Sequence, residues 1–236
     1  MQNSVKFLQS FNLIERHLRK KLKEKREASF YALVEAASKF DSVINKYKEE
    51  LKEYADLRNA IVHERTGGTV IAEPNDYAVK NIEHLASLIM DPPKVYPLFR
   101  RKVFSISVTE SIGAALKLMY ENSFSQLPIY KGEKFIDLLT NNTIARWLGS
   151  CVEEDIFSLG ETPIGEVLKF TEIPDNYFFL DRDAPLVEAM EKFQYFESIG
   201  SPLDAIIITQ NGKPTEAPLG IITTSDFPKI LLELNK

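Results

Sequence analysis

Cysteine is nearly absent from this sequence of 236 residues, since Cys151 is the only one. A single thiol excludes an intrachain disulfide and any zinc site built from several thiolates. Long apolar runs are also missing, and charged residues interrupt the first 26 positions, so no signal-peptide core can be found there. We therefore expect a cytoplasmic protein with no bound metal and no contact with a membrane.

Histidine is restricted to the first part of the chain, because His17, His63 and His84 all precede Pro92. No Gly-rich phosphate loop with a following Lys occurs after that point. The later part of the chain therefore lacks an obvious catalytic set.

Charge is unevenly distributed along the chain. Residues 1–92 carry 15 Lys and Arg against 14 Asp and Glu, whereas residues 93–236 carry 14 against 20. The densest basic stretch, residues 16–26, can follow an RNA backbone or form a solvated helix face. The N-terminal part thus permits RNA as a partner without requiring it.

Apolar residues up to Met90 recur at helical spacing, and the length suits two domains. The spacing predicts four amphipathic helices, marked by Leu8 to Leu22, Phe30 to Ala37, Val43 to Ile61 and Ala78 to Ile89. Gly67-Gly68 is suited to end the third helix, with a loop from Thr69 to Glu73. We expect an α+β protein of two domains, of which residues 1–92 form an antiparallel four-helix bundle.

After Pro92-Pro93 the spacing changes to short strands that alternate with helices. The predicted order strand, helix, strand, strand occurs twice. The first copy covers Val103–Ile106, Ile112–Tyr120, Leu127–Tyr130 and Phe135–Leu139. The second copy covers Tyr177–Leu180, Leu186–Phe193, Ala205–Thr209 and Leu219–Ile222, and a last helix follows over Phe227–Leu234. Ala115 and Ala189 correspond at an offset of 74, and Thr140 and Thr223 at 83. An internal duplication explains this pattern, with repeat one at about 93–150 and repeat two at about 161–236.

The last predicted strand of repeat two leads into a polar segment at a helix start. Thr223 offers a hydroxyl at the strand end, and Asp226 offers a carboxylate three residues later. Backbone N–H groups at a helix start favour phosphate, and a carboxylate can accept both ribose hydroxyls, while Gly220 can give the backbone room beside a ligand. A purely structural interpretation is that Thr223 or Ser225 caps the last helix with Asp226 in its first turn.

The segment Gly220-Ile221-Ile222-Thr223-Thr224-Ser225-Asp226 resembles the Gly-apolar-apolar-Thr/Ser-x-x-Asp motif of the CBS domain family. The resemblance implies a tandem CBS pair over residues 93–236, with an adenosine ligand in a cleft between the repeats. It implies that Thr223 contacts ribose or phosphate, that Asp226 holds the ribose hydroxyls and that Ile222 faces the base. AMP, ADP or ATP is the expected effector, with S-adenosylmethionine and cyclic dinucleotides as alternatives.

Repeat one departs from this motif, because Asp137 replaces the Gly and Thr143 replaces the Asp, so that only Thr140 remains. We therefore expect one competent cleft per chain. The basic residues that can neutralise a phosphate, or else lie on the solvated surface, are Arg100, Arg101, Lys102, Arg182 and Lys229.

A second polar cluster is expected in the N-terminal helical part. Asn59 and His63 are four residues apart and share a helix face, and the long Arg58 side chain can reach them. These residues resemble the Arg-Asn-x-x-x-His motif of HEPN-type helical domains, many of which are metal-independent endoribonucleases completed by dimerisation. Alternatively, Arg58 pairs with Asp56 or Glu64, Asn59 bonds between helices and His63 caps a helix end.

Together these features predict a regulatory, homodimeric protein in which the CBS pair senses an adenine nucleotide and controls an N-terminal HEPN-like domain. We do not expect an enzyme. The alternatives are a nucleotide-gated endoribonuclease that uses Arg58, Asn59 and His63, and a structural dimerisation module with a degenerate pocket.

Overall fold

The computed structural model describes residues 2–24, 27–63, 65–66, 69–70, 72–152 and 157–236, with the backbone alone at 63, 65–66 and 69–70. The chain divides into two compact units. The first comprises Met1–Pro93 with Pro185–Glu188 and Lys236, and the second comprises Lys94–Ala184 with Ala189–Asn235.

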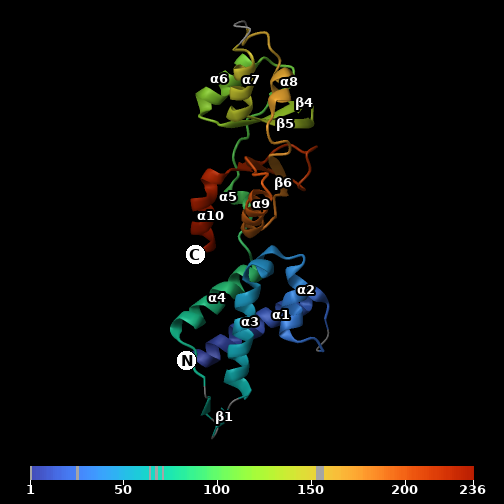
Figure 1. Ribbon diagram of the computed structural model, residues 1–236. Helices are drawn as coiled ribbons and strands as arrows, with labels where there is room; N and C mark the ends of the chain where they lie inside the picture. Colours follow the sequence, from blue (N-terminus) through green and yellow to red (C-terminus); the bar gives the residue numbers. More distant parts are fainter. Residues whose placement is uncertain (1, 25–26, 64, 67–68, 71, 153–156) are drawn as a thin grey trace. The chain divides into compact units, whose positions relative to one another are not determined.

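The N-terminal unit is a helical region built from α1 (Asn3–Leu22), α2 (Phe30–Ser38), α3 (Ser42–His63) and α4 (Asp76–Met90). Helix α1 packs against α2 and α4, and α2 packs against α3 (Figure 1). The predicted spacing produces the buried faces, since Phe7, Ile14 and Leu18 of α1 are fully buried. Ser29 and Asn75 cap α2 and α4 by accepting from backbone N–H groups. The four helices predicted for this part of the chain are therefore present.

Two details of the N-terminal unit differ from the prediction. Helix α3 is kinked at Tyr47, whose φ of −104° and ψ of 15° are not helical. Strand β1 (Arg65–Thr66) lies where the end of the third helix was expected, and it pairs antiparallel with β2 (Thr69–Val70) in the expected loop. Gly67-Gly68, predicted to cap α3, lie outside the described residues.

The second unit contains the two predicted repeats (Figure 1). Repeat one consists of β3 (Ile106–Ser107), α6 (Ile112–Asn122), β4 (Gln126–Lys131), β5 (Lys134–Thr140) and α7 (Asn141–Ser150). Repeat two consists of β6 (Tyr177–Asp181), α9 (Leu186–Ser198), β7 (Ala205–Thr209), β8 (Gly220–Ile222) and α10 (Phe227–Leu234).

Each repeat forms a three-stranded sheet of identical topology. In repeat one β3 runs parallel to β4 and β4 antiparallel to β5, and in repeat two β6 runs parallel to β7 and β7 antiparallel to β8. The registers also agree, because Asp137 pairs with Ile129 as Gly220 pairs with Ile208. The structure thus agrees with an internal duplication and makes Asp137 and Gly220 equivalent.

The repeats share a small apolar core. Phe135 and Leu138 of repeat one pack with Ala205 and Ile207 of repeat two, and partly buried aromatic rings surround them. Each repeat also buries apolar side chains of its own, as Ile129 does in repeat one and Ile208 in repeat two. This packing fixes the two sheets relative to each other.

The short connecting elements were not predicted from the sequence. They are α5 (Val95–Leu98), α8 (Ile164–Val167), and the 3₁₀ turns η1 (Leu168–Phe170) and η2 (Thr224–Asp226). The strand predicted from Val103 begins only at Ile106, because the pairing of β3 with β4 starts there. Such short elements depend on tertiary contacts more than on local periodicity.

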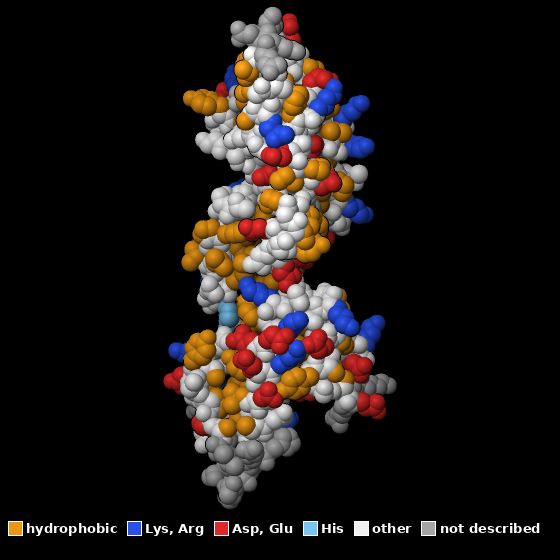
Figure 2. Space-filling model, in the orientation of Figure 1, with side chains coloured by type: hydrophobic (Ala, Val, Ile, Leu, Met, Phe, Trp, Pro, Cys, Tyr) orange, Lys and Arg blue, Asp and Glu red, His pale blue; other side chains and the backbone are white. Residues whose placement is uncertain are grey.

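Apolar side chains are exposed along α10, where Leu231 is 46% and Leu232 is 71% exposed. Figure 2 shows hydrophobic surface over this helix. Among the described residues, no helix is both long enough and apolar enough to cross a membrane.

Candidate functional site

A cavity of about 290 Å³ opens between the repeats of the second unit. The segment before β3 lines one wall, the connection from α6 to β4 lines another, and the end of β8 with η2 completes the cavity. The lining residues are Arg101, Lys102, Val103, Phe104, Asn122, Ser123, Phe124, Ser125, Gln126, Pro128, Ile221, Thr223 and Ser225.

Gly220 allows the chain segment before β3 to lie directly on β8. Arg100 forms a β-bridge with Gly220, and a Cβ on Gly220 would come within 2.2 Å of the carbonyl oxygen of Phe99. Only glycine permits this approach without a shift of the backbone. The room that Gly220 provides is therefore taken by the protein's own backbone, not by the ligand as the sequence suggested.

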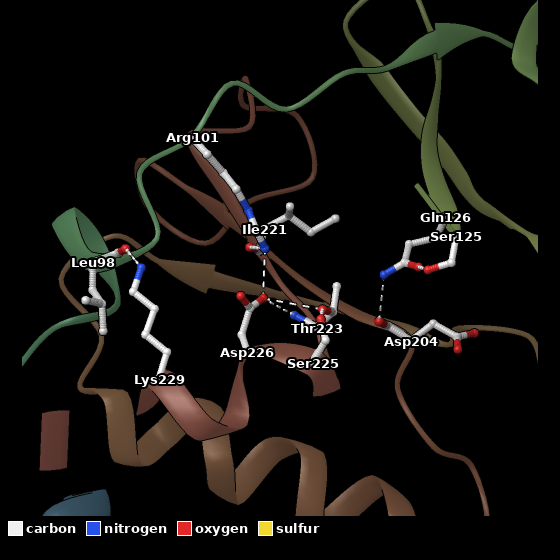
Figure 3. Close-up of polar contacts among 10 residues, drawn as sticks. All are labelled: Leu98, Arg101, Ser125, Gln126, Asp204, Ile221, Thr223, Ser225, Asp226 and Lys229. Atoms are coloured by element: carbon white, nitrogen blue, oxygen red, sulfur yellow. Dashed lines mark hydrogen bonds and ion pairs between the residues drawn. The ribbon is translucent and has the colours of Figure 1, made fainter. Parts of the chain in front are cut away.

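This close approach brings Arg101 to the end of β8 (Figure 3). Its guanidinium donates to the carbonyl oxygen of Ile221 and forms an ion pair with Asp226, with 2.8 Å between Nη2 and Oδ2. The side chain of Arg101 is 44% exposed and that of Asp226 is 15% exposed. Arg101 lines the cavity, whereas Asp226 is not among the lining residues.

Thr223, Ser225 and Asp226 form a hydrogen-bonded turn at the start of η2 (Figure 3). The Asp226 carboxylate accepts from the backbone N–H of Thr223 at 2.9 Å, within a capping box. The hydroxyls of Thr223 and Ser225 lie 2.7 Å apart. Thr223 therefore has a capping role, but it caps η2 and not, as the alternative had proposed, the last helix α10. Both Thr223 and Ser225 still line the cavity.

Adjacent isoleucines of β8 have opposite roles. Ile222 is fully buried, whereas Ile221 lines the cavity. Successive side chains of a strand point to opposite faces of the sheet, so these two residues cannot share one environment. Ile221, and not the expected Ile222, is placed to form an apolar wall for a ligand.

The equivalent turn in repeat one lacks a carboxylate. Thr140 caps α7 by accepting from the backbone N–H of Thr143 at 3.1 Å, and both residues are buried. Asp137 occupies the position of Gly220, and burial, with the nearby charge of Asp175, raises the pKa of its carboxyl. Burial and the same two carboxylates raise the pKa of Tyr177 to about 12. This part of repeat one is therefore acidic and is not suited to hold phosphate.

The structure separates the five basic residues suggested for phosphate. Arg101 and Lys102 line the cavity. Arg100 and Arg182 lie over the ring of Tyr96, at 5.9 and 4.3 Å from its centroid, and Lys229 donates to the carbonyl oxygen of Leu98 at 2.7 Å. These last three side chains contact the chain around α5 and do not line the cavity.

In the N-terminal unit, Arg58 and Asn59 lie on α3, where the guanidinium donates to the Asn59 side-chain oxygen at 3.2 Å. Asp56, an alternative partner of Arg58, accepts from the hydroxyl of Tyr31. His63 ends α3, but its side chain is outside the described part of the chain, as is Glu64.

Several cavity residues were not identified from the sequence. The ring centroids of Phe104 and Phe124 are 5.4 Å apart, and the Lys102 amino group lies 4.7 Å from the centroid of the Phe104 ring. Gln126 donates to the carbonyl oxygen of Asp204 in repeat two at 3.2 Å. No local motif marks these residues, because the sheet pairing alone brings residues 122–126 to the cavity.

Comparison with known proteins identifies part of the second unit. Residues 95–150 match the model of the CBS domain family, which confirms that expectation for repeat one. Repeat two, which carries the complete motif, lies outside the matched range. No curated protein matches the chain.

Solved structures similar to this chain are CBS-domain proteins. One is a candidate acetoin utilization protein from Vibrio cholerae, 22% identical over 60% of this chain and 92% of that one, with a TM-score of 0.44. Another is a CBS domain pair in complex with 5′-methylthioadenosine and S-adenosyl-L-methionine, 16% identical over 61% and 99%, with a TM-score of 0.44. A third is the CBS domain of a membrane protein from Sphaerobacter thermophilus, 16% identical over 59% and 88%, with a TM-score of 0.44.

Proposed function

We propose that the cavity beside β8 binds an adenine nucleotide and that the protein acts as a nucleotide sensor. The observation that carries this proposal is the combination of apolar and cationic walls in one cavity between the repeats. Its volume of about 290 Å³ lies just below the range for small-molecule sites, roughly 300–1,000 Å³. A single nucleotide is therefore the appropriate size of ligand.

Each part of a nucleotide has a complementary group in the cavity. Phe104, Phe124 and Ile221 offer apolar contact to a base. The hydroxyls of Thr223 and Ser225 can bond ribose or phosphate, and Lys102 offers a positive charge to phosphate. Asp226, once released from Arg101, can accept both ribose hydroxyls.

Calorimetric titration of the full chain with AMP tests the proposal, with ADP, ATP, S-adenosylmethionine and cyclic dinucleotides as further ligands. Asp226→Ala is expected to weaken AMP binding by about tenfold or more, because two charge-assisted hydrogen bonds are lost. Thr143→Ala, at the position of repeat one equivalent to Asp226, is the matched control and should leave affinity unchanged. Equal affinities of wild type and Asp226→Ala remove Asp226 from the site.

A thermal-shift series with the same ligands separates sensing from a purely structural role. A ligand that binds only the native state raises the unfolding temperature in proportion to the logarithm of its concentration. If none of the five ligand types produces a shift, the cavity does not function as a nucleotide site and the structural alternative is favoured.

We further propose that nucleotide binding alters the packing of the two repeats and thereby controls the helical N-terminal region in a homodimer. The exposed Leu231 and Leu232 of α10 offer an apolar surface on which a second copy can pack. Light scattering tests this assembly, since Leu232→Lys should lower the measured mass if α10 is the interface.

Endoribonuclease activity is the second candidate function, favoured by the contact of Arg58 with Asn59 near the end of α3. In this proposal, Arg58 stabilises the charged transition state and His63 moves a proton. RNA is the substrate and would make binding strongly dependent on salt. Cleavage of RNA that is lost in Arg58→Ala and in His63→Ala supports the enzyme, and cleavage that persists in both excludes it.

A further inference from the structure

The carboxylate expected to hold the ribose already has a charged partner within the protein. Asp226 accepts from the backbone of Thr223 at 2.9 Å and from the guanidinium of Arg101 at 2.8 Å (Figure 3). Arg101 lines the cavity and Asp226 does not, so the guanidinium is the member of this ion pair that a ligand in the cavity meets first.

The charges on the cavity wall favour a ligand that can cause this movement. Arg101 and Lys102 are its two charged lining residues, and both are cationic. The Arg101 side chain is 44% exposed, and an ion pair with so exposed a partner is weak and easily exchanged. A phosphate offers the guanidinium two acceptor oxygens in the geometry that a carboxylate would otherwise supply.

The equivalent position beside β5 carries the opposite charge. Asp175 lies 74 residues after Arg101, the offset that also relates Ala115 to Ala189. Asp175 raises the pKa of Asp137, which stands in the place of Gly220. The arginine is therefore a feature of the cavity beside β8 and not of the repeat in general.

From these observations we propose that Arg101 determines the class of ligand, by exchanging Asp226 for the phosphate of a nucleotide. This inference rests on the proposed function. Phosphate draws the guanidinium away, and the freed Asp226 carboxylate then accepts the ribose hydroxyls. A neutral nucleoside must break the same ion pair without replacing it. S-adenosylmethionine offers a carboxylate but no phosphate, and its net positive charge opposes binding beside two cations.

Calorimetry of the full chain with AMP and with adenosine tests the exchange. Wild type is expected to bind AMP at least about tenfold more tightly than adenosine, because the phosphate forms charge-assisted bonds. Arg101→Met should weaken AMP binding while leaving adenosine binding unchanged or stronger, so that the preference disappears. Raising the salt concentration should weaken AMP binding alone.

Two further variants keep the result interpretable. Arg100→Met removes the neighbouring arginine, whose side chain lies over Tyr96, and should preserve the preference for AMP. Arg101→Lys keeps the charge but loses the two-pronged geometry, and should retain part of the preference. It also serves if Arg101→Met fails to fold.

The outcomes distinguish the inference from the function on which it rests. If AMP and adenosine bind wild type equally, or if Arg101→Met weakens both to the same extent, the exchange is overturned while nucleotide binding stands. If neither compound binds wild type, the proposed function fails and the inference fails with it.

Discussion

The two repeats share one topology but treat the same strand position differently. Leu138 of β5 is fully buried in the core between the repeats, whereas the equivalent Ile221 of β8 is only partly buried against that core and also lines the cavity. Aromatic rings pack around the first position, among them Phe135 and Tyr177 at 4.7 Å between centroids. The two repeats thus share one backbone frame, but a cavity lies beside this position only in β8 among the described residues.

Charge separates the repeats further. The cluster around β8 combines Gly220, Arg101 and Asp226, whereas the equivalent residues around β5 are Asp137, Asp175 and Thr143. A cation paired with a carboxylate is replaced by two carboxylates, one of which has a raised pKa. The surroundings of the segment Gly220 to Asp226 therefore depend on the chain segment packed beside it as much as on its own residues.

The largest predicted effect concerns the two isoleucines of β8. Ile222→Ala should lower the free energy of unfolding by about 2–5 kcal/mol, because it leaves a void in a fully buried site. Ile221→Ala should destabilise less but weaken AMP binding. Urea denaturation and calorimetry on both variants measure the contrast, and the opposite ranking would mean that the faces of β8 have been exchanged.

Gly220→Ala should destabilise the protein by about 1–3 kcal/mol, since its Cβ would meet backbone atoms of Phe99. The displaced segment carries Arg101, so AMP affinity should fall as well. Gly149→Ala is the matched control, because a Cβ there meets nothing within 4 Å. Equal unfolding midpoints for the two variants would contradict the close approach.

Transplanting the carboxylate into repeat one should not create a site. Thr143 is only 2% exposed, and Thr143→Asp should destabilise by about 1–3 kcal/mol because a charge is enclosed there. Thr143→Val, which removes only the hydroxyl, should be milder. A stable Thr143→Asp protein that binds two AMP molecules per chain would show that the repeats differ by this residue alone.

The smallest effect is expected at Asp137. Folding raises the pKa of the Asp137 carboxyl, so its ionisation lowers the stability of the folded protein. This loss of stability is absent below the pKa of the unfolded chain and grows as pH rises through the pKa of the folded state. Asp137→Asn should therefore stabilise the protein near pH 7 by less than about 1 kcal/mol, because the group is only partly buried. Thermal unfolding between pH 3 and pH 7 should show this advantage vanish in acid, and a constant difference would argue against a titrating carboxylate.

Much of the fold could be predicted because its signals are periodic. The helical spacing of apolar residues predicted α1 to α4, and the repeated order of strand, helix, strand, strand predicted the strands of both repeats. The paired registers of Asp137 and Gly220 confirm the alignment that the offsets suggested. Short elements such as α5, β1 and β2 were missed, because they have too few residues to form a recognisable period.

Local chemistry was fixed by the sequence itself. The residues Gly220 to Asp226 determined a strand that ends in a capped turn, and the substitutions at 137 and 143 determined that repeat one would differ. What only the tertiary structure decided is which groups meet: Arg101 lies 125 residues before Asp226, yet the two are paired. This pairing depends on Gly220, because the missing side chain lets the backbone around Phe99 pack directly on β8. No local sequence pattern shows that two segments so far apart in the chain will meet.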